Sequence, residues 1–300
     1  MKISVIIPAF NAEHYIRTAI ESCLGQTCPP HEIIVIDDAS TDGTAALAES
    51  FPSPVRVIRL AENMGVASAR NRGVQASTGD WLAFLDADDW FLPMKLELQQ
   101  RCAAESPNAV LIYTGWRIIG VDGVEFPGRF KPPSEIMPLL RYRCGFHVGT
   151  VALRRDAFDA VGGFDAACIG TEDWDLWLRI AARYSVQSFA AVAEPLAVYR
   201  RVAGSLSFVA AKYLRWRPYV YKKSSLFGTS GVPRFLWRLK LSSFNYYDTS
   251  ESLRDEGSHC FLPFMLISLM IWPFPCFAMR NRFKIAIVMA IQTCKWLLSR

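Results

Sequence analysis

The chain has 300 residues, of which 51% are hydrophobic; this excludes a disordered protein and allows one large domain, or one domain with an appendage. The formal net charge of +5 hides an asymmetry, because residues 1–199 hold 17 Lys and Arg against 24 Asp and Glu, whereas residues 200–300 hold 16 against 4. A basic, aromatic-rich tail behind an acidic body indicates an anionic surface as a partner.

Eight cysteines are scattered along the chain, and no pair has the short spacing of a zinc knuckle. This usage is typical of a reduced, cytosolic protein whose thiols act as small apolar residues. The apolar run at residues 3–7 already predicts a strand, so we expect no signal peptide.

Short apolar runs alternate with helical patterns over the first 85 residues. We predict, in chain order, strand 3–7, a helix capped by Asn11, strand 32–36, helix 44–51, strand 55–59, helix 66–75 and strand 81–85. This alternation predicts an α/β fold with a mostly parallel central sheet and helices on both faces.

The pattern is less regular after residue 90. We predict helix 94–105, strand 110–116, loops and a hairpin over 117–150, strand 150–154 with a helical turn after it, helix 172–184 and a last strand at 197–201. We therefore place a catalytic domain at residues 1–207 and a helical, basic tail at residues 208–300.

The tail contains a basic, aromatic-rich segment and two apolar runs. Residues 261–279 are uncharged but interrupted by prolines, and residues 285–298 contain Lys295 as their one charge. A run of about 19 residues barely spans a bilayer core. Two readings stay open, a pair of amphipathic helices packed on the body and an association with the membrane.

Three carboxylates stand at the end of the predicted strand 81–85, as Asp86, Asp88 and Asp89. They would repel one another unless a cation lies among them. In an α/β fold this edge of the sheet is also where ligands bind. The cluster indicates a divalent metal bound to a phosphorylated ligand; the alternative is a solvated acidic turn.

Six short stretches stand at the turns of the predicted fold. They are residues 5–11 (VIIPAFN), 35–44 (VIDDASTDGT), 63–71 (NMGVASARN), 86–89 (DADD), 162–165 (GGFD) and 172–176 (EDWDL). In this order they closely resemble the family-2 inverting glycosyltransferases with a type A (GT-A) fold, over about residues 1–207. The resemblance implies a Rossmann-like fold and transfer of a sugar from a nucleotide-sugar donor with inversion at the anomeric carbon.

The resemblance places the nucleotide at the ends of the first strands. It favours Asp38 as the residue that accepts the imide N–H of a uracil ring, with Phe10 as a flat apolar face and Pro8 and Asn11 beside it. The alternative for Asp37 or Asp38 is capping of the turn that follows.

Two further residues are candidates for the border of the nucleotide pocket. They are Asn63 and Arg70, although Arg70 could equally pair with a surface carboxylate.

Asp86 and Asp88 would share one face if strand geometry persisted through them. We predict Asp88 as the main metal ligand and Asp86 on the ribose or on a metal-bound water. Mg²⁺ or Mn²⁺ would bridge the two phosphates and neutralise the departing diphosphate. Asp89 could instead cap the following helix.

Asp173 is the candidate general base, because inversion needs a carboxylate opposite the leaving group to take the acceptor's proton. The alternative is that the acidic residues here only favour a helix N-terminus. We expect Glu172 to orient the acceptor or a backbone group, and Trp174 either to stack on a sugar or to fill the core.

One position departs from the family pattern. Many relatives have a histidine two residues after Tyr-Arg, near the metal and the diphosphate, whereas this chain has Val202. Arg200 or Arg201 could carry the leaving-group charge instead. For the lone His147, an acceptor-side role and a structural role both stay open.

We therefore expect an enzyme that transfers one sugar from a UDP-sugar to a glycan or lipid-linked acceptor of the cell envelope. We expect it to lie at the cytoplasmic face of the membrane and to have no nucleic acid partner. A nucleotidyltransferase would need a glycine-rich loop where residues 8–11 stand. A processive polysaccharide synthase would need Gln-x-x-Arg-Trp where residues 212–216 begin with Lys. A non-catalytic membrane-bound binding module stays open because of Val202.

Overall fold

The computed structural model describes residues 1–128, 130–202, 219–220, 223, 239, 241–244, 246–247 and 261–271. The chain divides into two compact units, Met1–Ser205 and Leu206–Arg300.

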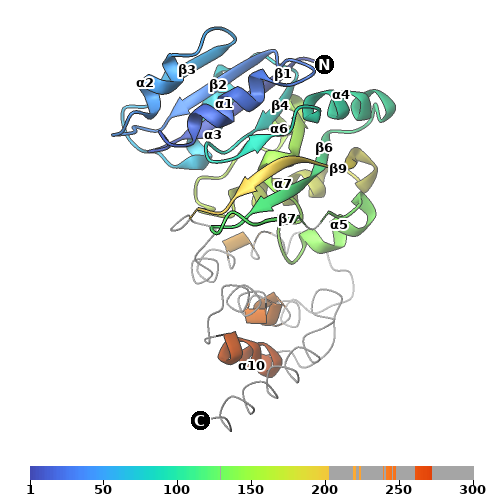
Figure 1. Cartoon of the computed structure of the whole chain (residues 1–300). Coiled ribbons are helices and arrows are strands. Elements are labelled where there is room, and N and C mark those ends of the chain that lie inside the picture. Colours follow the sequence, from blue (N-terminus) through green and yellow to red (C-terminus); the bar gives the residue numbers. More distant parts are fainter. Residues whose placement is uncertain are drawn as a thin grey trace. The chain divides into compact units, whose positions relative to one another are not determined.

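The strands of the first unit form one sheet (Figure 1). The strand order is β3 (Val55–Arg59), β2 (Glu32–Asp37), β1 (Ile3–Ala9), β4 (Trp81–Phe84), β8 (Val151–Arg154), β6 (Leu111–Ile119), β9 (Phe189–Arg200) and β5 (Trp90–Phe91), and β7 (Glu125–Pro127) pairs with β6. The first four strands are the predicted ones, and β9 is longer than expected.

The first half of the sheet is parallel, and β6 and β9 also pair in parallel further along it. The four strands from β3 to β4 pair in parallel, with Ile6 of β1 opposite Ile34 of β2 and Phe84 of β4. The next strand, β8, is antiparallel to both β4 and β6. The predicted α/β fold is confirmed, but the whole sheet is mixed because β8 inserts between two strands that precede it in the chain.

Helices cover both faces, as predicted. The side chains of Ile3, Val5 and Ile7 pack in one core with α1 (Ile16–Leu24), α2 (Thr44–Glu49) and α4 (Lys95–Glu105). The intervening Ile6 points to the other face. There α3 (Val66–Ala76) approaches so closely that a Cβ on Gly73 would lie 2.4 Å from Cγ2 of Ile6.

The segment expected to hold only loops and a hairpin also contains a helix. The hairpin is β6–β7, and the helix is α5 (Pro133–Leu140). Pro133 stands in the first turn, where a missing N–H breaks no helical hydrogen bond. Ile136 and Leu140 are buried, so packing on the body stabilises this short helix.

The remaining elements of the first unit lead to the last strand. They are the single-turn helix η1 (Val148–Thr150), α6 (Arg155–Ala160), α7 (Glu172–Arg183) and the single-turn helix η2 (Val186–Ser188).

Asn11 does not cap a helix, which corrects our expectation. The first helix begins at Ile16, and Asn11 lies in a left-handed conformation with φ of 48°. Its Oδ1 accepts the backbone N–H of Thr41 at 2.9 Å, and its own N–H donates to Oγ of Ser40 at 3.0 Å. Asn11 therefore ties the loop after β1 to the loop after β2.

In the second unit, α10 (Phe261–Ile271) is described. Its Met265 is buried and its Met270 is 83% exposed. Among the described residues, no helix is both long enough and apolar enough to cross a membrane. Most of the basic segment 208–240, the end of the first apolar run and the whole of the second run lie outside the described residues.

Candidate active site

The candidate residues gather where β1, β2 and β4 end. Asp38 directly follows β2, Phe10 follows β1 and is 50% exposed, and the aspartate turn, which we define as residues 86–89, follows β4. Pro8 is buried within β1. Because these strands are parallel, their carboxyl ends meet at one edge, as is usual for ligand sites in such sheets.

Asp38 organises the loop before α3. Its two carboxylate oxygens accept the backbone N–H groups of Met64 and Gly65, each at 2.8 Å, and Asn63 donates to its carbonyl at 3.3 Å. Gly65 has φ of 81°, a conformation that glycine adopts without strain. Among the described residues, the buried Oδ1 of the neighbouring Asp37 has no hydrogen-bond partner.

The aspartate turn does not continue the strand. Regular β4 geometry ends at Phe84, and the N–H of Asp89 donates to the carbonyl of Asp86. Asp86 and Asp88 therefore do not share a strand face. Asp86, Asp89 and His147 bring one ligand atom each to within 4.8 Å of one another.

Asp88, which we expected to be the main metal ligand, is not part of this group of three. Burial, and repulsion from Asp86, raise the pKa of Asp88 to about 6.

Asp89 is a buried site residue and not a helix cap. Helix α4 begins only at Lys95, and Asp89 is 2% exposed. Its Oδ1 accepts the backbone N–H of Arg200 at 2.8 Å, whereas its Oδ2 accepts no hydrogen bond from the described residues. Burial, followed by repulsion from Asp88 and Asp86, raises the pKa of Asp89 well above its usual value.

Arg200 lies beside the same turn. Its Nε donates to the carbonyl of Asp88 at 3.1 Å, and its guanidinium packs over the rings of Trp90 and Tyr15. Arg201 instead packs over Phe126 of β7. Of the two arginines considered for the leaving group, Arg200 is the one that contacts the aspartate turn.

Arg70 joins the aspartate turn to α7. It is 2% exposed, and its guanidinium binds Oδ1 of Asp86 at 2.6 Å and Oε1 of Glu172 at 2.8 Å. It therefore pairs with two site carboxylates and not with a surface one. Burial alone would raise the pKa of Asp86, but the attraction of Arg70 and then of His147 outweighs it and lowers that pKa.

Asp173 stands in the first turn of α7. Its Oδ1 accepts the N–H of Trp174 at 2.6 Å, and Sγ of Cys144 lies 3.6 Å from its Oδ2. Burial, and repulsion from Glu172, raise the pKa of Asp173 to about 7. A carboxylate with this pKa is a much stronger base than an ordinary aspartate and is about half ionised at neutral pH.

Trp174 belongs to the core and not to a sugar-binding surface. It is 2% exposed, and its Nε1 donates to the carbonyl of Leu140 at 2.7 Å. Of our two expectations for this residue, the structure favours the core.

One residue of the site, Cys144, was missed, and the role of a second, Asp89, was left open. Cys144 contacts Asp173 from a segment that we treated as irregular, and nothing in its local sequence signals this contact. Asp89 was visible as the third carboxylate of the cluster, but its burial follows from its pairing with β9.

The residues of the aspartate turn fit a divalent cation. Carboxylate oxygens are the ligands that Mg²⁺ and Mn²⁺ prefer. The unpartnered Oδ2 of Asp89 and the raised pKa values of Asp88 and Asp89 indicate carboxylates whose ionised forms are unfavourable on their own and would be stabilised by a cation.

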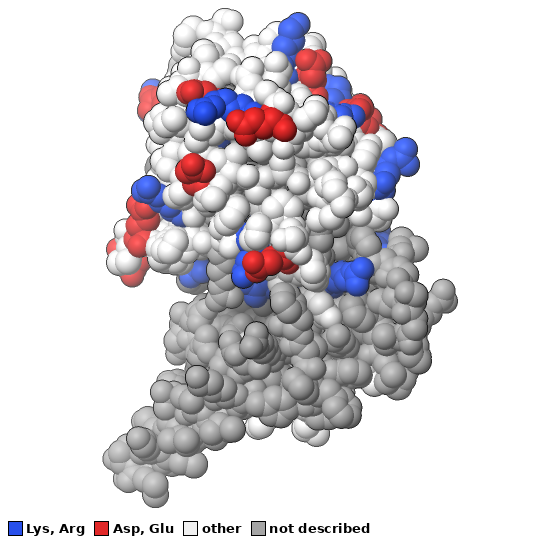
Figure 2. Space-filling view, turned by 90° about the vertical axis from the view of Figure 1, so that its right-hand side faces the viewer, with Lys and Arg blue, Asp and Glu red and all other residues white. Residues whose placement is uncertain are grey.

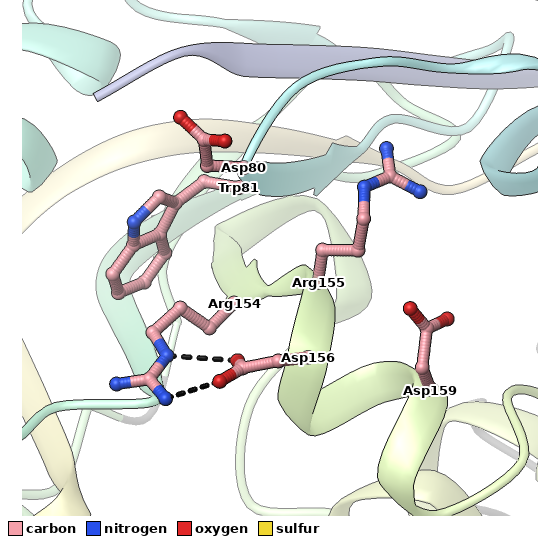
Figure 3. Close-up of a pocket in the computed structure, with 6 residues that line it drawn as sticks. All are labelled: Asp80, Trp81, Arg154, Arg155, Asp156 and Asp159. Carbon is pink, nitrogen blue, oxygen red and sulfur yellow. Dashed lines mark hydrogen bonds and ion pairs between the residues drawn. The ribbon is translucent and has the colours of Figure 1, made fainter.

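A hollow lies at the opposite end of β4 (Figure 3). It is lined by Asp80, Trp81, Arg154, Arg155, Asp156 and Asp159. Arg154 pairs there with Asp156, and Arg155 donates to the carbonyls of Gly79 and Val74. Since β4 runs from this hollow towards the aspartate turn, the hollow is separate from the candidate active site.

Comparison with known proteins identifies the family. The model described as glycosyl transferase family 2 matches residues 4–162. Five curated relatives named uncharacterized glycosyltransferases, from Haemophilus influenzae and Rickettsia species, are 31–33% identical over 59–65% of this chain. The matches cover 27–66% of their lengths, less than two thirds of each.

One relative carries a specific name, "UDP-Glc:alpha-D-GlcNAc-diphosphoundecaprenol beta-1,3-glucosyltransferase WfgD" of Escherichia coli. It is 34% identical over 59% of this chain and 69% of its own length.

Two solved structures share the fold. TarS residues 1–349 of S. aureus, in complex with UDP-GlcNAc, superposes with a TM-score of 0.61 at 16% identity and covers 90% of this chain and 86% of its own. The mannosyltransferase PcManGT of Pyrobaculum calidifontis, in complex with GDP-Man and Mn²⁺, has a TM-score of 0.54 at 18% identity and covers 96% and 84%.

The mixed sheet, with acidic residues at the ends of its parallel strands, is that of a GT-A protein. The chain belongs to glycosyl transferase family 2. The resemblance drawn from the six sequence stretches is therefore confirmed.

Proposed function

We propose that this protein transfers one sugar from a UDP-sugar to a glycan or lipid-linked acceptor by a single inverting displacement. The observation that carries the proposal is the buried chain of contacts from Asp86 through Arg70 to Glu172, the neighbour of Asp173. It links the turn suited to a metal and a diphosphate with a carboxylate suited to act as a base.

Asp173 is proposed as the base. It takes the proton of an acceptor hydroxyl while the hydroxyl oxygen bonds to the anomeric carbon, and the bond from that carbon to the diphosphate oxygen breaks on the opposite face. The raised pKa of Asp173 supports this role, because a base works best when its pKa lies near the working pH. Glu172 is held by Arg70 and orients this end of α7.

The nucleotide is proposed to bind across the ends of β1 and β2. Phe10 offers an exposed ring, and Asn11 and Asn63 hold the adjoining loops. Asp38 remains our candidate for reading the base, since each carboxylate oxygen can accept one more hydrogen bond beyond its backbone amide. UDP is favoured because the structure of TarS contains UDP-GlcNAc.

A divalent metal, Mn²⁺ or Mg²⁺, is proposed at the aspartate turn. Asp86, Asp88 and Asp89 would hold it, and it would neutralise the charge of the departing diphosphate. The complex of PcManGT with Mn²⁺ supports this choice of ion. Arg200, which contacts the same turn, would add a fixed positive charge for the leaving group.

The acceptor is proposed to be a lipid-linked precursor of a cell-envelope glycan. The name of WfgD includes a diphosphoundecaprenol acceptor, and the basic tail of this chain suits an anionic membrane surface. The tail would then hold the enzyme at the cytoplasmic face of the membrane.

A donor screen with a base variant tests the proposal. Nucleotide sugars are incubated with the full chain and Mn²⁺, and the release of nucleoside diphosphate is measured with membrane extract as acceptor source. We expect release from a UDP-sugar, and a 10²–10⁴-fold loss in Asp173→Asn without a change in UDP binding. The matched control is Asp159→Asn, at the opposite end of β4. Full activity of Asp173→Asn would exclude Asp173 as the base.

A further inference from the structure

His147 lies beside the aspartate turn, although it is far from it in sequence. Its ring packs on Tyr199 of β9 at a centroid distance of 4.8 Å. Nε2 of His147 is 3.6 Å from Oδ2 of Asp89 and 3.9 Å from Oδ2 of Asp86. Both distances are too long for a direct hydrogen bond, so Nε2 lies beside the two carboxylates without donating to either.

The hydrogen bonding of the ring shows which nitrogen carries the proton. The backbone N–H of Gly149 donates to Nδ1 of His147 at 3.1 Å. Nδ1 therefore has the lone pair, and in the neutral ring the proton is on Nε2. The backbone holds this arrangement, because the N–H and the Oγ1 of Thr150 both donate to the carbonyl of His147.

This arrangement makes His147 a donor and not a metal ligand. Binding a cation through Nε2 would require the proton to move to Nδ1, where the N–H of Gly149 already points. A histidine that binds a metal normally donates from its other nitrogen to a carboxylate, a carbonyl or water. In His147 the other nitrogen, Nδ1, accepts a hydrogen bond from the N–H of Gly149 and does not donate one.

A ligand group that binds beside Nε2 must accept a hydrogen bond from it and tolerate two neighbouring carboxylates. A phosphate oxygen meets both conditions when a divalent cation enters with it, because the cation attracts the phosphate and the carboxylates alike.

We propose that His147 binds the diphosphate of the donor by donating from Nε2 to one of its oxygens, and that it does not bind the metal. The inference rests on the proposed function. It predicts that loss of the imidazole weakens the binding of the nucleotide and leaves the affinity for the metal alone unchanged.

The test measures the two affinities separately on the full chain. Mn²⁺ binding without nucleotide is followed by electron paramagnetic resonance, and UDP binding at saturating Mn²⁺ by calorimetry, with GDP in parallel. The variants are His147→Ala, which removes the donor, and His147→Gln, whose amide nitrogen still donates a hydrogen bond but has no lone pair available for a metal. His31→Ala is the matched control, because His31 precedes β2 at the opposite end of the sheet and contacts Thr78.

We expect His147→Ala to lower the affinity for UDP about 10- to 100-fold, which is the usual effect of losing a hydrogen bond to a charged group. His147→Gln should recover part of this loss. Both variants should bind Mn²⁺ alone with an affinity within about twofold of that of the wild type. Such a change is well below the effect of losing a hydrogen bond. Equal thermal unfolding midpoints show that the variants are folded.

Two results would overturn the inference. Weaker binding of Mn²⁺ alone in both variants would make His147 a metal ligand, and unchanged UDP binding in His147→Ala would exclude any contact with the diphosphate. If the wild type bound neither UDP nor GDP with Mn²⁺, the proposed function would fail first and the inference with it.

Discussion

At the scale of single residues, one buried arginine connects the parts of the candidate site. Arg70 lies on α3, yet it binds carboxylates that follow β4 and begin α7. Its guanidinium also packs over the ring of Phe164 at 5.3 Å. Removing one partner of such a buried ion network is costly, because the remaining charges are left without compensation.

Arg70→Met should therefore lower the free energy of unfolding by about 3–5 kcal/mol, since the buried Glu172 and the half-buried Asp86 would lose their positive partner. Urea denaturation measures the change. The control is Arg72→Met on the exposed side of the same helix, which should change stability by less than about 0.5 kcal/mol. Equal effects of the two substitutions would show that the buried network contributes nothing beyond a lost surface charge.

The pH dependence of transfer should report on Asp173. A base must be ionised, and burial and Glu172 raise the pKa of Asp173 to about 7. The rate should therefore rise with pH up to about 7 and then level off, and Glu172→Gln should move the midpoint to lower pH because it removes a repelling charge. The measurement is kcat/KM against pH in both proteins. A midpoint near 4 that Glu172→Gln leaves unchanged would contradict this assignment.

At the scale of elements, α4 packs on the sheet through polar residues. Lys95 and Gln99 are fully buried, and Nζ of Lys95 donates to Oε1 of Gln99 at 2.9 Å. The amide of Gln99 in turn donates to the carbonyls of Ile112 in β6 and Thr150 in η1. Burial lowers the pKa of Lys95 from 10.5 to about 7. The helix is thus fixed by hydrogen bonds that only its tertiary position allows.

The buried lysine should make stability depend on pH. Its pKa is lower in the folded than in the unfolded chain, so between pH 7 and 10 the unfolded state binds the additional proton and stability rises with pH. The wild type should gain stability relative to Lys95→Met by about 1.4 kcal/mol per pH unit in this window, and nothing below it. Urea denaturation at pH 6 to 10 measures this difference. Lys2→Met, at an exposed position, should show no such slope.

At the scale of the whole molecule, charge is divided between the two units. On the face that Figure 2 shows, acidic and basic side chains of the described residues are mixed. The second unit, residues 206–300, holds 14 Lys and Arg against 4 Asp and Glu. The net positive charge of the protein therefore resides in the tail, and we expect the tail to carry any attraction to anionic lipid.

The full chain should bind phosphatidylglycerol vesicles and be released as salt is raised from about 0.05 M to about 0.5 M, because salt screens exposed charges. Vesicle sedimentation measures the bound fraction. Neutral phosphatidylcholine vesicles and a chain ending at Ser205 are the controls, and neither should bind. Binding that is equal for the two lipids would contradict an electrostatic role of the tail.

Local patterns determined most of the first four strands and their helices. The apolar runs that became β1 to β4 each satisfy a short-range rule, and parallel pairing then brings their carboxyl ends together. The nucleotide-side residues and the aspartate turn could be located for this reason. Asn11 was misread because a helix cap and a loop–loop contact use the same side-chain chemistry.

Only the tertiary structure decided which atoms of the site meet. Arg70 and Glu172 are 102 positions apart, and the buried Asp89 accepts the backbone N–H of Arg200, which is 111 positions away. The insertion of β8 between β4 and β6 places His147 beside the aspartate turn. The amino-acid sequence by itself determines elements that a local pattern of apolar residues marks. Contacts between distant elements depend on the order of strands in the sheet, which local patterns do not encode.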